Sequence, residues 1–329
     1  MSEPGRPDHV LVVGGGITGL VAAYRLTQGG VDVTLVEPGP LGGKLQTSVV
    51  AGRPVDETAD AFLLRVPWAL ALCHDLELDG ELISPAERNA HVFCEGTRHP
   101  LPTGHVLGVP TDLDALAASG LISPAGVERA RQDLTLPEDP ADPTALGPDV
   151  AIGPYLRRRL GDEVVDHLID PLLGGINAGD TASMSLAAVV AQLDAAARTE
   201  DPSLIRSLIA QRQRATAPTA SAGSGSVVAA VGSQPEAPPI FATPLGGMAR
   251  IIDALVGFVP AADVRQGRRI EVLELVGRSG RAVQATLDDG SEIDADAVIV
   301  TTPAHVSGPL LRTIDAETAA TPEVVDHSS

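Results

Sequence analysis

The stretch VLVVGGGITGLVAAYRL, residues 10–26, joins a run of β-branched residues to a run of helix formers through three consecutive glycines. Residues 9–13 are predicted to form a buried strand, residues 17–28 a helix and residues 31–36 a second strand. These three segments make a β-α-β unit. The start of the chain is therefore predicted to be an α/β domain of the Rossmann type.

The glycines form the pattern GxGxxG between the strand and the helix. Gly14 permits a tight turn, Gly16 lets a pyrophosphate approach the backbone, and Gly19 allows the helix to pack closely on the strand. The positive end of the helix then faces the phosphates. Glu37 follows Gly19 by 18 residues, at the end of the second strand, where its carboxylate can accept hydrogen bonds from a ribose diol. The spacing predicts a dinucleotide site.

A second glycine motif, LGGKLQT at residues 41–47, follows almost at once. Gly42 and Gly43 expose backbone, and Lys44 adds a positive charge. A plain NAD site would instead continue the alternation of strands and helices. Together the motifs VVGGGITGL, Glu37 and LGGKLQT resemble the FAD-binding start of the flavin amine oxidase and protoporphyrinogen oxidase superfamily, which implies FAD as cofactor.

The resemblance also implies which residues hold FAD. Residues 60–62 are expected beside the isoalloxazine ring, and Ile270, where the family often has valine, is expected to contact adenine through its backbone. The cofactor-binding residues expected are Gly14, Gly15, Gly16, Ile17, Thr18, Gly19, Glu37, Gly42, Gly43, Lys44, Asp60, Ala61, Phe62, Ile270 and Thr302.

Four later segments, residues 56–85, 98–116, 119–134 and 156–180, resemble the porphyrinogen oxidases of heme synthesis. Within that family, the LPTGHVLGVPTDL style is similar to bacterial coproporphyrinogen III oxidases. Protoporphyrinogen IX stays open as the substrate, because the two porphyrinogens share the macrocycle and differ in two propionates. An amine oxidase or a desaturase is a further alternative, although an aromatic content of 2% leaves few side chains for the cage that amines favour.

The family resemblance implies removal of six electrons from coproporphyrinogen III to give coproporphyrin III, with O2 reoxidising the flavin to H2O2. The resemblance implies no dedicated catalytic base. The sequence also shows no recognisable Ser/His/Asp triad or Cys/His dyad. Arg65 is expected to hold a substrate propionate, with an interdomain salt bridge as the alternative. Asn177 is expected to touch the macrocycle, unless its GG segment only caps a helix. The basic run at 157–159 fits propionates, anionic lipid or a solvated helix face.

The composition limits which binding partners and which cellular location the protein is expected to have. A formal charge of −20 disfavours nucleic acid, and the spacing of Cys73 and Cys94 fits neither a zinc site nor a disulfide framework. No metal site is expected. Neither a secretory signal nor a spanning apolar run is visible. The sequence predicts a cytoplasmic protein, and peripheral contact with the inner membrane face stays open.

Late strands suggest one domain assembled from distant segments, with a mainly helical or mixed substrate domain inserted; the longest helical pattern covers residues 153–173. The expected divisions are residues 1–70 (FAD domain, first part), 71–214 (substrate and helical domain), 215–239 (flexible Ala/Ser/Gly/Pro loop), 240–304 (FAD domain, second part) and 305–329 (start of a truncated substrate-domain segment, with a sheet beginning near Leu310).

Members of the resembling family usually run well past residue 329, adding a late glycine segment that closes over the flavin. The sequence is therefore expected to be C-terminally truncated, with weak or no activity alone. A completing chain or a homo-oligomer stays open. The remaining alternative is a non-catalytic FAD-binding remnant.

Overall fold

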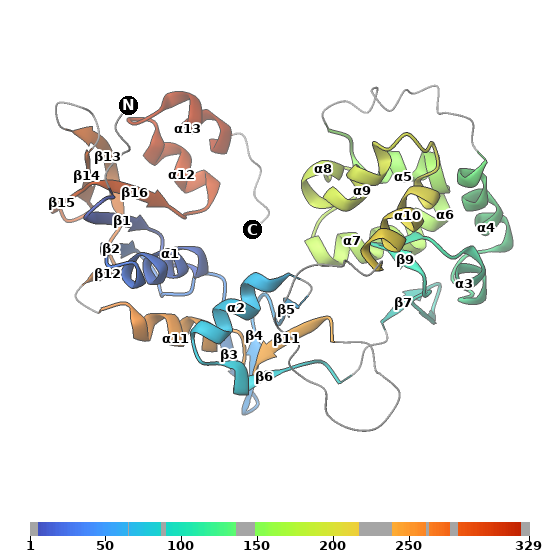
Figure 1. The fold of residues 1–329 in the computed structure, drawn as a ribbon, viewed down its shortest axis with the longest axis horizontal. Helices are drawn as coiled ribbons and strands as arrows, with labels where there is room; N and C mark the ends of the chain where they lie inside the picture. The colour runs from blue at the N-terminus through green and yellow to red at the C-terminus, as the bar shows by residue number, and fades with distance from the viewer. Residues whose placement is uncertain are drawn as a thin grey trace. The chain divides into compact units, whose positions relative to one another are not determined.

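The computed structural model describes residues 6–64, 66–86, 90–135, 149–216, 239–260, 263–276 and 282–323. The chain forms two compact units (Figure 1). Unit 1 contains Met1–Ala86 and Ser233–Ser329, and unit 2 contains Glu87–Gly232. Unit 1 is thus built from the two ends of the chain, with unit 2 inserted between them.

Unit 1 is organised around a four-stranded parallel sheet in the order β12-β2-β1-β16. Its strands are β1 (His9–Val13), β2 (Asp32–Glu37), β12 (Val264–Gln266) and β16 (Ala297–Val300). Helix α1 (Ile17–Gln28) connects β1 to β2. The predicted fold class, a discontinuous Rossmann-type α/β domain, is confirmed.

The two faces of this sheet are covered by different layers, and β1 divides its side chains between them because strand residues alternate. Val10 and Val12 lie in a helix-side cluster, and Leu11 and Val13 lie in a meander-side cluster on the opposite face. The helix side is covered by α1, α2 (Pro67–Asp75) and α11 (Ala249–Phe258). The meander is the antiparallel sheet β13 (Ile270–Val276), β14 (Ala282–Leu287) and β15 (Glu292–Ala295).

The sheet expected to begin near Leu310 is wrong for the described part of the segment after residue 303, which is helical. Residues beyond it form α12 (Ala304–Leu311) and α13 (Ala316–Glu323) in unit 1, and no strand begins near Leu310 in the described range that ends at residue 323. Leu310 is 7% exposed, and Val306 and Ile314, spaced four residues to either side of it, pack on the same meander-side cluster. This four-residue spacing is typical of one helix face, which explains why the segment is not a strand.

The first boundary also differs from the expected one at residue 70. Leu72, Cys73, Leu76 and Leu78 are buried in the helix-side cluster with α1 and α11, so unit 1 continues to Ala86. The remaining elements of unit 1 are the hairpin β3 (Thr47–Val50) and β4 (Arg53–Asp56), the 3-10 helix η1 (Asp79–Glu81), and the small sheet β5 (Phe62–Leu63), β11 (Phe241–Pro244) and β6 (Leu82–Ile83).

Unit 2 is mainly helical. It contains the hairpins β7 (His91–Cys94) with β8 (Thr97–Pro100) and β9 (His105–Val106) with β10 (Val109–Pro110). Its helices are α3 (Leu113–Ala118), α4 (Pro124–Arg131), η2 (Gln132–Leu134), α5 (Ile152–Leu160), α6 (Asp162–Val164), the π-helical turn η4 (Val165–Ile169), α7 (Asp170–Asn177), α8 (Leu186–Val189), α9 (Ala191–Ala197) and α10 (Leu204–Thr216). The flexible loop was expected at residues 215–239. Its first two positions belong to α10, and residues 217–238 lie outside the described residues.

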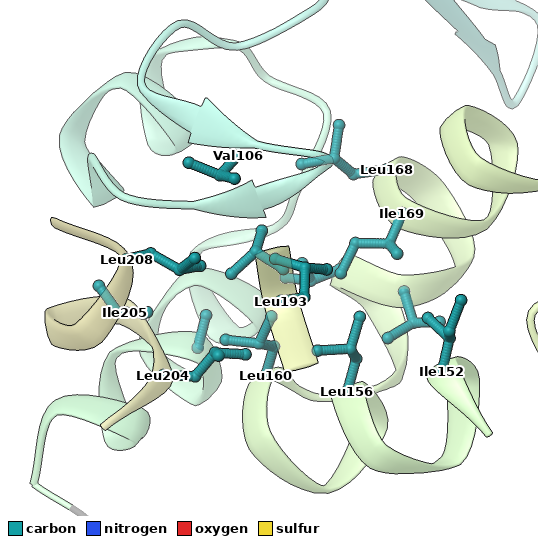
Figure 2. Packing of buried hydrophobic residues seen from close by; sticks show 14 of the residues in the cluster. Val106, Ile152, Leu156, Leu160, Leu168, Ile169, Leu193, Leu204, Ile205 and Leu208 are labelled. Carbon is teal, nitrogen blue, oxygen red and sulfur yellow. The ribbon is translucent and has the colours of Figure 1, made fainter. Parts of the chain in front are cut away.

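The single helical pattern predicted over 153–173 is broken at Gly161, which has φ of +92°. This left-handed conformation ends α5 and lets the chain turn. Leu156 and Leu160 of α5 then meet Leu168 and Ile169 of the π-helical turn in the core of unit 2 (Figure 2).

A buried ion pair crosses unit 2. The Arg159 Nε lies 2.8 Å from Asp133 Oδ1, and the two side chains are 7% and 0% exposed. Asp133 Oδ2 accepts hydrogen bonds of 2.9 Å from Ser203 Oγ and the Ile205 backbone N–H. The basic run 157–159 is therefore not one solvated helix face, because Arg159 points inward and connects α5 to η2 and α10.

Among the described helices, none is both long and apolar enough to span a lipid bilayer.

Candidate dinucleotide-binding site

The candidate site lies where the parallel strands of unit 1 end. β1 has β2 on one side and β16 on the other, so the connections leaving β1 and its neighbours diverge there. In open parallel sheets, ligands bind in the crevice at such a switch point, beyond the carboxyl ends of the strands. The glycine loop follows β1, Glu37 ends β2, and Thr301 and Thr302 follow β16.

Three of the glycines are required by packing within the protein. A Cβ on Gly19 would lie 1.8 Å from the backbone oxygen of Gly14, and a Cβ on Gly14 would lie 2.7 Å from Thr301 Oγ1. A Cβ on Gly15 would lie 2.7 Å from the Leu41 side chain. Gly14 also has φ of +106°, a conformation that favours glycine. These positions hold the loop tightly between β1, β16 and α1.

Gly16 differs, because a Cβ there would meet no protein atom within 4 Å. Gly16 is the N-cap of α1, and no side chain caps the helix or places a carboxylate in its first turn. The first backbone N–H groups of a helix lack partners within the helix, and together they favour an anion. Open space, free donors and positive potential coincide here. This arrangement fits the pyrophosphate of a dinucleotide, with Ile17 and Thr18 as the first helical residues.

The second glycine motif packs directly on the first. The Gly42 N–H donates to the Gly15 backbone oxygen at 2.8 Å, and Gly16 and Gly42 form a parallel β-bridge. A Cβ on Gly43, which has φ of +58°, would lie 3.1 Å from the Gly16 Cα. Lys44 follows with an exposed side chain. The structure therefore brings the two glycine motifs together beside the open face of Gly16.

Glu37 is oriented by backbone amides at the same edge. Its Oε2 accepts from the Gly15 N–H at 2.6 Å, and its Oε1 accepts from the Gly39 N–H at 2.7 Å. An ionised carboxylate has about four lone-pair positions, so two remain for ribose hydroxyls. The half-buried carboxylate is thus held in place and keeps lone pairs free to accept hydrogen bonds, as a site for a ribose diol requires.

The sequence reasoning missed two supporting groups. Thr301 Oγ1 lies 3.0 Å from the backbone oxygens of both Val13 and Gly14, which fixes the entry to the glycine loop. The predicted residue Thr302 lies next to it and shares a hydrogen bond with Ser307 Oγ at 2.8 Å. Two adjacent threonines directly after an apolar strand were the available signal for Thr301.

The second missed group joins the LGGKLQT motif to α11. Asp56 Oδ1 accepts from the Met248 N–H at 2.9 Å, and Thr47 Oγ1 accepts from the Ala249 N–H at 3.1 Å. Gly247 has φ of +105°, and a Cβ there would lie 2.6 Å from Thr47. The start of α11 is therefore capped by residues about 200 positions away, a relationship that no local pattern predicts.

Of the residues expected to contact FAD through its flavin ring or adenine, only Phe62 packs in the same cluster as residues of the two glycine motifs. Phe62 packs against the helix-side cluster, as do Ile17 and Leu41, whereas Asp60 is exposed and Ala61 half-buried. Ile270 is 4% exposed in the meander-side cluster. Arg65 lies outside the described residues. The flavin contacts of these residues stay predictions.

Asn177 belongs to unit 2, at the end of α7. Its Nδ2 donates to the Leu173 backbone oxygen at 2.8 Å, and the next residue, Ala178, is left-handed with φ of +48°. The Gly179 N–H then donates to the Gly174 backbone oxygen at 3.1 Å. This is a helix C-terminus of the kind that the capping alternative describes, and contact with a macrocycle stays a prediction.

The free thiol of Cys73 lies buried in unit 1. Burial, and after it the charge of the nearby Asp79, raise the pKa of the Cys73 thiol to about 11, which keeps this thiol protonated and unreactive. Within the described part of the chain, no three His, Cys, Asp or Glu side chains gather so as to hold a metal ion.

Comparisons with known proteins agree with this geometry. A sequence profile described as flavin containing amine oxidoreductase matches residues 17–324. A coproporphyrinogen III oxidase from Bacillus subtilis is 34% identical over 315 residues, which cover 94% of this chain and 62% of the relative. A coproporphyrinogen III oxidase from Mycobacterium tuberculosis is 32% identical, with 98% of this chain and 65% of the relative covered. The chain thus spans a little under two thirds of the length of these curated relatives.

Solved structures support the same assignment. A protein from Exiguobacterium sp. 255-15, described as a candidate protoporphyrinogen oxidase, superimposes with a TM-score of 0.72 at 28% identity, over 95% of this chain and 63% of that protein. A putrescine oxidase superimposes with a TM-score of 0.59 at 16% identity, over 92% and 60% of the two chains, and shows the fold alone.

The expected resemblance to the porphyrinogen oxidases and the expected FAD cofactor are both confirmed by these matches. The profile match spans both units and begins at Ile17, within the glycine motif described above. The chain belongs to the flavin containing amine oxidoreductase family.

Proposed function

We propose that this chain carries the FAD site of an oxygen-dependent coproporphyrinogen III oxidase, which removes six electrons from coproporphyrinogen III to give coproporphyrin III. One observation carries the proposal. Relatives named coproporphyrinogen III oxidase match the chain at 32–34% identity over 92–98% of its length, so the match includes the inserted unit 2 as well as the nucleotide sheet.

FAD, when bound, would supply the acceptor for the electron pairs, with O2 as the final oxidant. The protein's own groups bind and orient it. The open face of Gly16 and the first amides of α1 would hold the pyrophosphate, and the Glu37 carboxylate would accept hydrogen bonds from the ribose. Gly43 and Lys44 would flank the same nucleotide.

The substrate side of the proposal uses Arg65 and Asn177. A guanidinium at position 65 matches a propionate in charge and in bidentate geometry. The substrate carries its own carboxylates, and no dedicated protein base is required, because aromatisation drives the loss of the pyrrole proton. A homo-oligomer and peripheral contact with a membrane belong to the same proposal.

The competing substrate is protoporphyrinogen IX. It is favoured by similarity to protoporphyrinogen oxidase 2 of Arabidopsis thaliana, at 29% identity over 180 residues and 54% of this chain. Porphyrin fluorescence should therefore be followed with each porphyrinogen in turn, with and without added FAD. We expect faster appearance of coproporphyrin, dependent on FAD. Equal rates, or faster protoporphyrin formation, would reassign the substrate.

A non-catalytic FAD-binding role is the second candidate, because the nucleotide site of unit 1 lies entirely within one unit and could bind FAD without turnover of a porphyrinogen. Purified protein with stoichiometric flavin absorbance, but without porphyrin or H2O2 formation from either substrate, would favour this role. Oxidase activity of the 329-residue chain would exclude it.

A further inference from the structure

The side chain that follows the second glycine motif holds its turn closed. This LGGK turn consists of residues 41–44. Gln46 Nε2 donates hydrogen bonds of 3.1 Å to the backbone oxygens of Leu41 and of Gly43. A carbonyl oxygen only accepts, so the NH2 end of the carboxamide must face the turn. One half-buried side chain therefore ties the first residue of the turn to the third.

The other carbonyl oxygens of the LGGK turn have partners as well. The Gly42 oxygen accepts from the Leu45 N–H at 3.1 Å. The Lys44 oxygen accepts from the Gln46 N–H at 3.0 Å and from Thr58 Oγ1 at 2.6 Å. All four carbonyl oxygens of the turn are thus bonded, three of them to Gln46. Gln46 is therefore the main restraint on the shape of the turn.

The shape of the LGGK turn matters because the turn borders the open space at Gly16. Gly16 and Gly42 form a β-bridge, and a Cβ on Gly43 would lie 3.1 Å from the Gly16 Cα. On its other side the turn meets α11, since a Cβ on Gly42 would lie 3.0 Å from the Ile252 side chain. The turn is packed between the first glycine loop and α11, so a change in its shape would displace backbone beside the expected pyrophosphate.

The two glycines of the turn make such a restraint necessary. Gly42 and Gly43 have φ of +100° and +58°, and without a side chain each can adopt many other conformations. A loop that already has its bound conformation loses less conformational entropy when a ligand binds, which raises affinity. The two donors of the Gln46 carboxamide thus give the free protein an order that FAD would otherwise have to impose.

We propose that Gln46 is a positioning residue for the cofactor, which holds the LGGK turn in its FAD-binding shape before FAD binds. Gln46 acts through Gly43 and Lys44 and needs no contact of its own with FAD. The inference rests on the proposed function, in which these two residues flank the nucleotide, and it adds a residue whose role is to order the turn.

The first test is a titration of the apoprotein with FAD, followed by flavin fluorescence. Gln46→Met keeps the length of the side chain and removes both donors, so we expect affinity to fall about tenfold. Gln28→Met is the matched control, because Gln28 is exposed in the last turn of α1, and its affinity should match wild type. Wild-type affinity in Gln46→Met would overturn the proposal.

A carboxylate at the same position provides a readout that loss of packing would not give. In Gln46→Glu, an ionised carboxylate faces two carbonyl oxygens and donates nothing, whereas a protonated one donates one hydrogen bond. Because these oxygens raise the pKa of the new carboxyl group, FAD affinity should lie at least about tenfold below wild type at about pH 8 and recover about threefold or more at about pH 5.5. Gln46→Met should not recover. Equal pH profiles in the two variants would contradict the proposal.

Proteolysis reports on the turn itself. Lys44 is the only lysine in the sequence, so lysyl endopeptidase can cut the chain only after this residue. The rate at which a folded protein is cut follows how often the local backbone opens. We expect FAD-free Gln46→Met to be cut at least about threefold faster than wild type and Gln28→Met, and FAD to slow the cut in all three. Equal rates in the FAD-free proteins would mean that Gln46 does not order the turn.

Gly16→Ala, titrated alongside, separates this inference from the proposed site. If Gly16→Ala weakens FAD binding and Gln46→Met does not, the site stands and the positioning role of Gln46 is wrong. If neither substitution changes affinity, FAD does not bind at the glycine motifs, and both assignments are wrong.

Discussion

The backbone oxygen of Gly14 lies 1.8 Å from the position that a Cβ on Gly19 would take. α1 therefore packs on the glycine loop at a distance that only a glycine allows. At Gly16, two residues along the loop, nothing in the protein lies within 4 Å of the same position. The first and last glycines of the motif serve the fold, and the middle one leaves room for a ligand.

This contrast predicts opposite effects of two similar substitutions. Gly16→Ala should leave the unfolding free energy within about 0.5 kcal/mol of wild type but should weaken FAD binding at least about tenfold, because its methyl group enters the space for the pyrophosphate. Gly19→Ala should destabilise unit 1 by about 3 kcal/mol through overpacking. Thermal melts of the apoprotein and flavin titrations measure the two effects. A stable Gly19→Ala variant, or a Gly16→Ala variant with wild-type flavin affinity, would contradict this assignment.

Glu37→Gln should weaken FAD binding by about ten- to a hundredfold, since a hydrogen bond to a charged group contributes roughly 1.5–3 kcal/mol. The amide nearly preserves the shape of the side chain. Its NH2 group would nevertheless face either a backbone N–H or the ribose. Glu57→Gln is a suitable control, because Glu57 is exposed and contacts Ser48 instead. Equal flavin affinity in both variants would remove Glu37 from the site.

Lys44 is the only lysine in the 329 residues and has an exposed side chain beside the second glycine motif. An amine-reactive reagent therefore modifies one side chain, together with the α-amino group. We expect bound FAD to slow modification of Lys44 severalfold, because the nucleotide would cover it, and to leave the α-amino group unaffected. Peptide mass spectrometry distinguishes the two sites. Equal labelling of Lys44 with and without FAD would exclude it from the cofactor site.

The Asp133–Arg159 ion pair predicts a large loss of stability in unit 2. Asp133→Ala leaves the buried guanidinium uncompensated, which typically destabilises a protein by about 3–5 kcal/mol. Asp114→Ala is the surface control, since Asp114 is 99% exposed and lies 3.9 Å from Arg131; we expect less than about 1 kcal/mol there. Urea unfolding monitored by circular dichroism provides the comparison. Similar losses in the two variants would show that burial of the pair is not decisive.

His105 makes stability depend on pH. Burial, and then the charge of Arg212, lower the pKa of His105 below its usual value of 6.5. The unfolded chain therefore binds the proton first as the pH falls, so stability is fully present above about pH 6.5 and is lost as the pH falls through the folded pKa. In the fold, His105 Nδ1 accepts from the Gly108 N–H at 3.1 Å, which Asn can imitate. His105→Asn should flatten the dependence between pH 7.5 and 5.5, whereas His91→Asn should not. An unchanged slope in His105→Asn would assign the acid sensitivity to other groups.

Local sequence predicted the elements that depend on nearby residues. The strand at 9–13 and the helix at 17–28 have the predicted limits, because the hydrophobic run, the glycines and the helix formers all act within a few residues of one another. Glu37 was also predicted at its strand end, since the length of a β-α-β unit sets that spacing.

Distant contacts explain the errors. Arg159 was grouped with its exposed neighbours because a run of three arginines carries no information about Asp133, which lies 26 residues earlier. A sheet was expected near Leu310, in the segment 305–329, because the meander that buries Leu310 is not visible in the segment itself.

The amino-acid sequence by itself determined the nucleotide-binding β-α-β unit, its two glycine motifs and their family, because turn geometry, helix propensity and strand alternation are short-range properties. Only the tertiary structure decided that Gly16 faces open space while Gly19 touches backbone, and that Thr47 and Asp56 cap α11. These relationships arise when segments far apart in the chain pack together, and burial then selects which polar groups are paired and which remain available to a ligand.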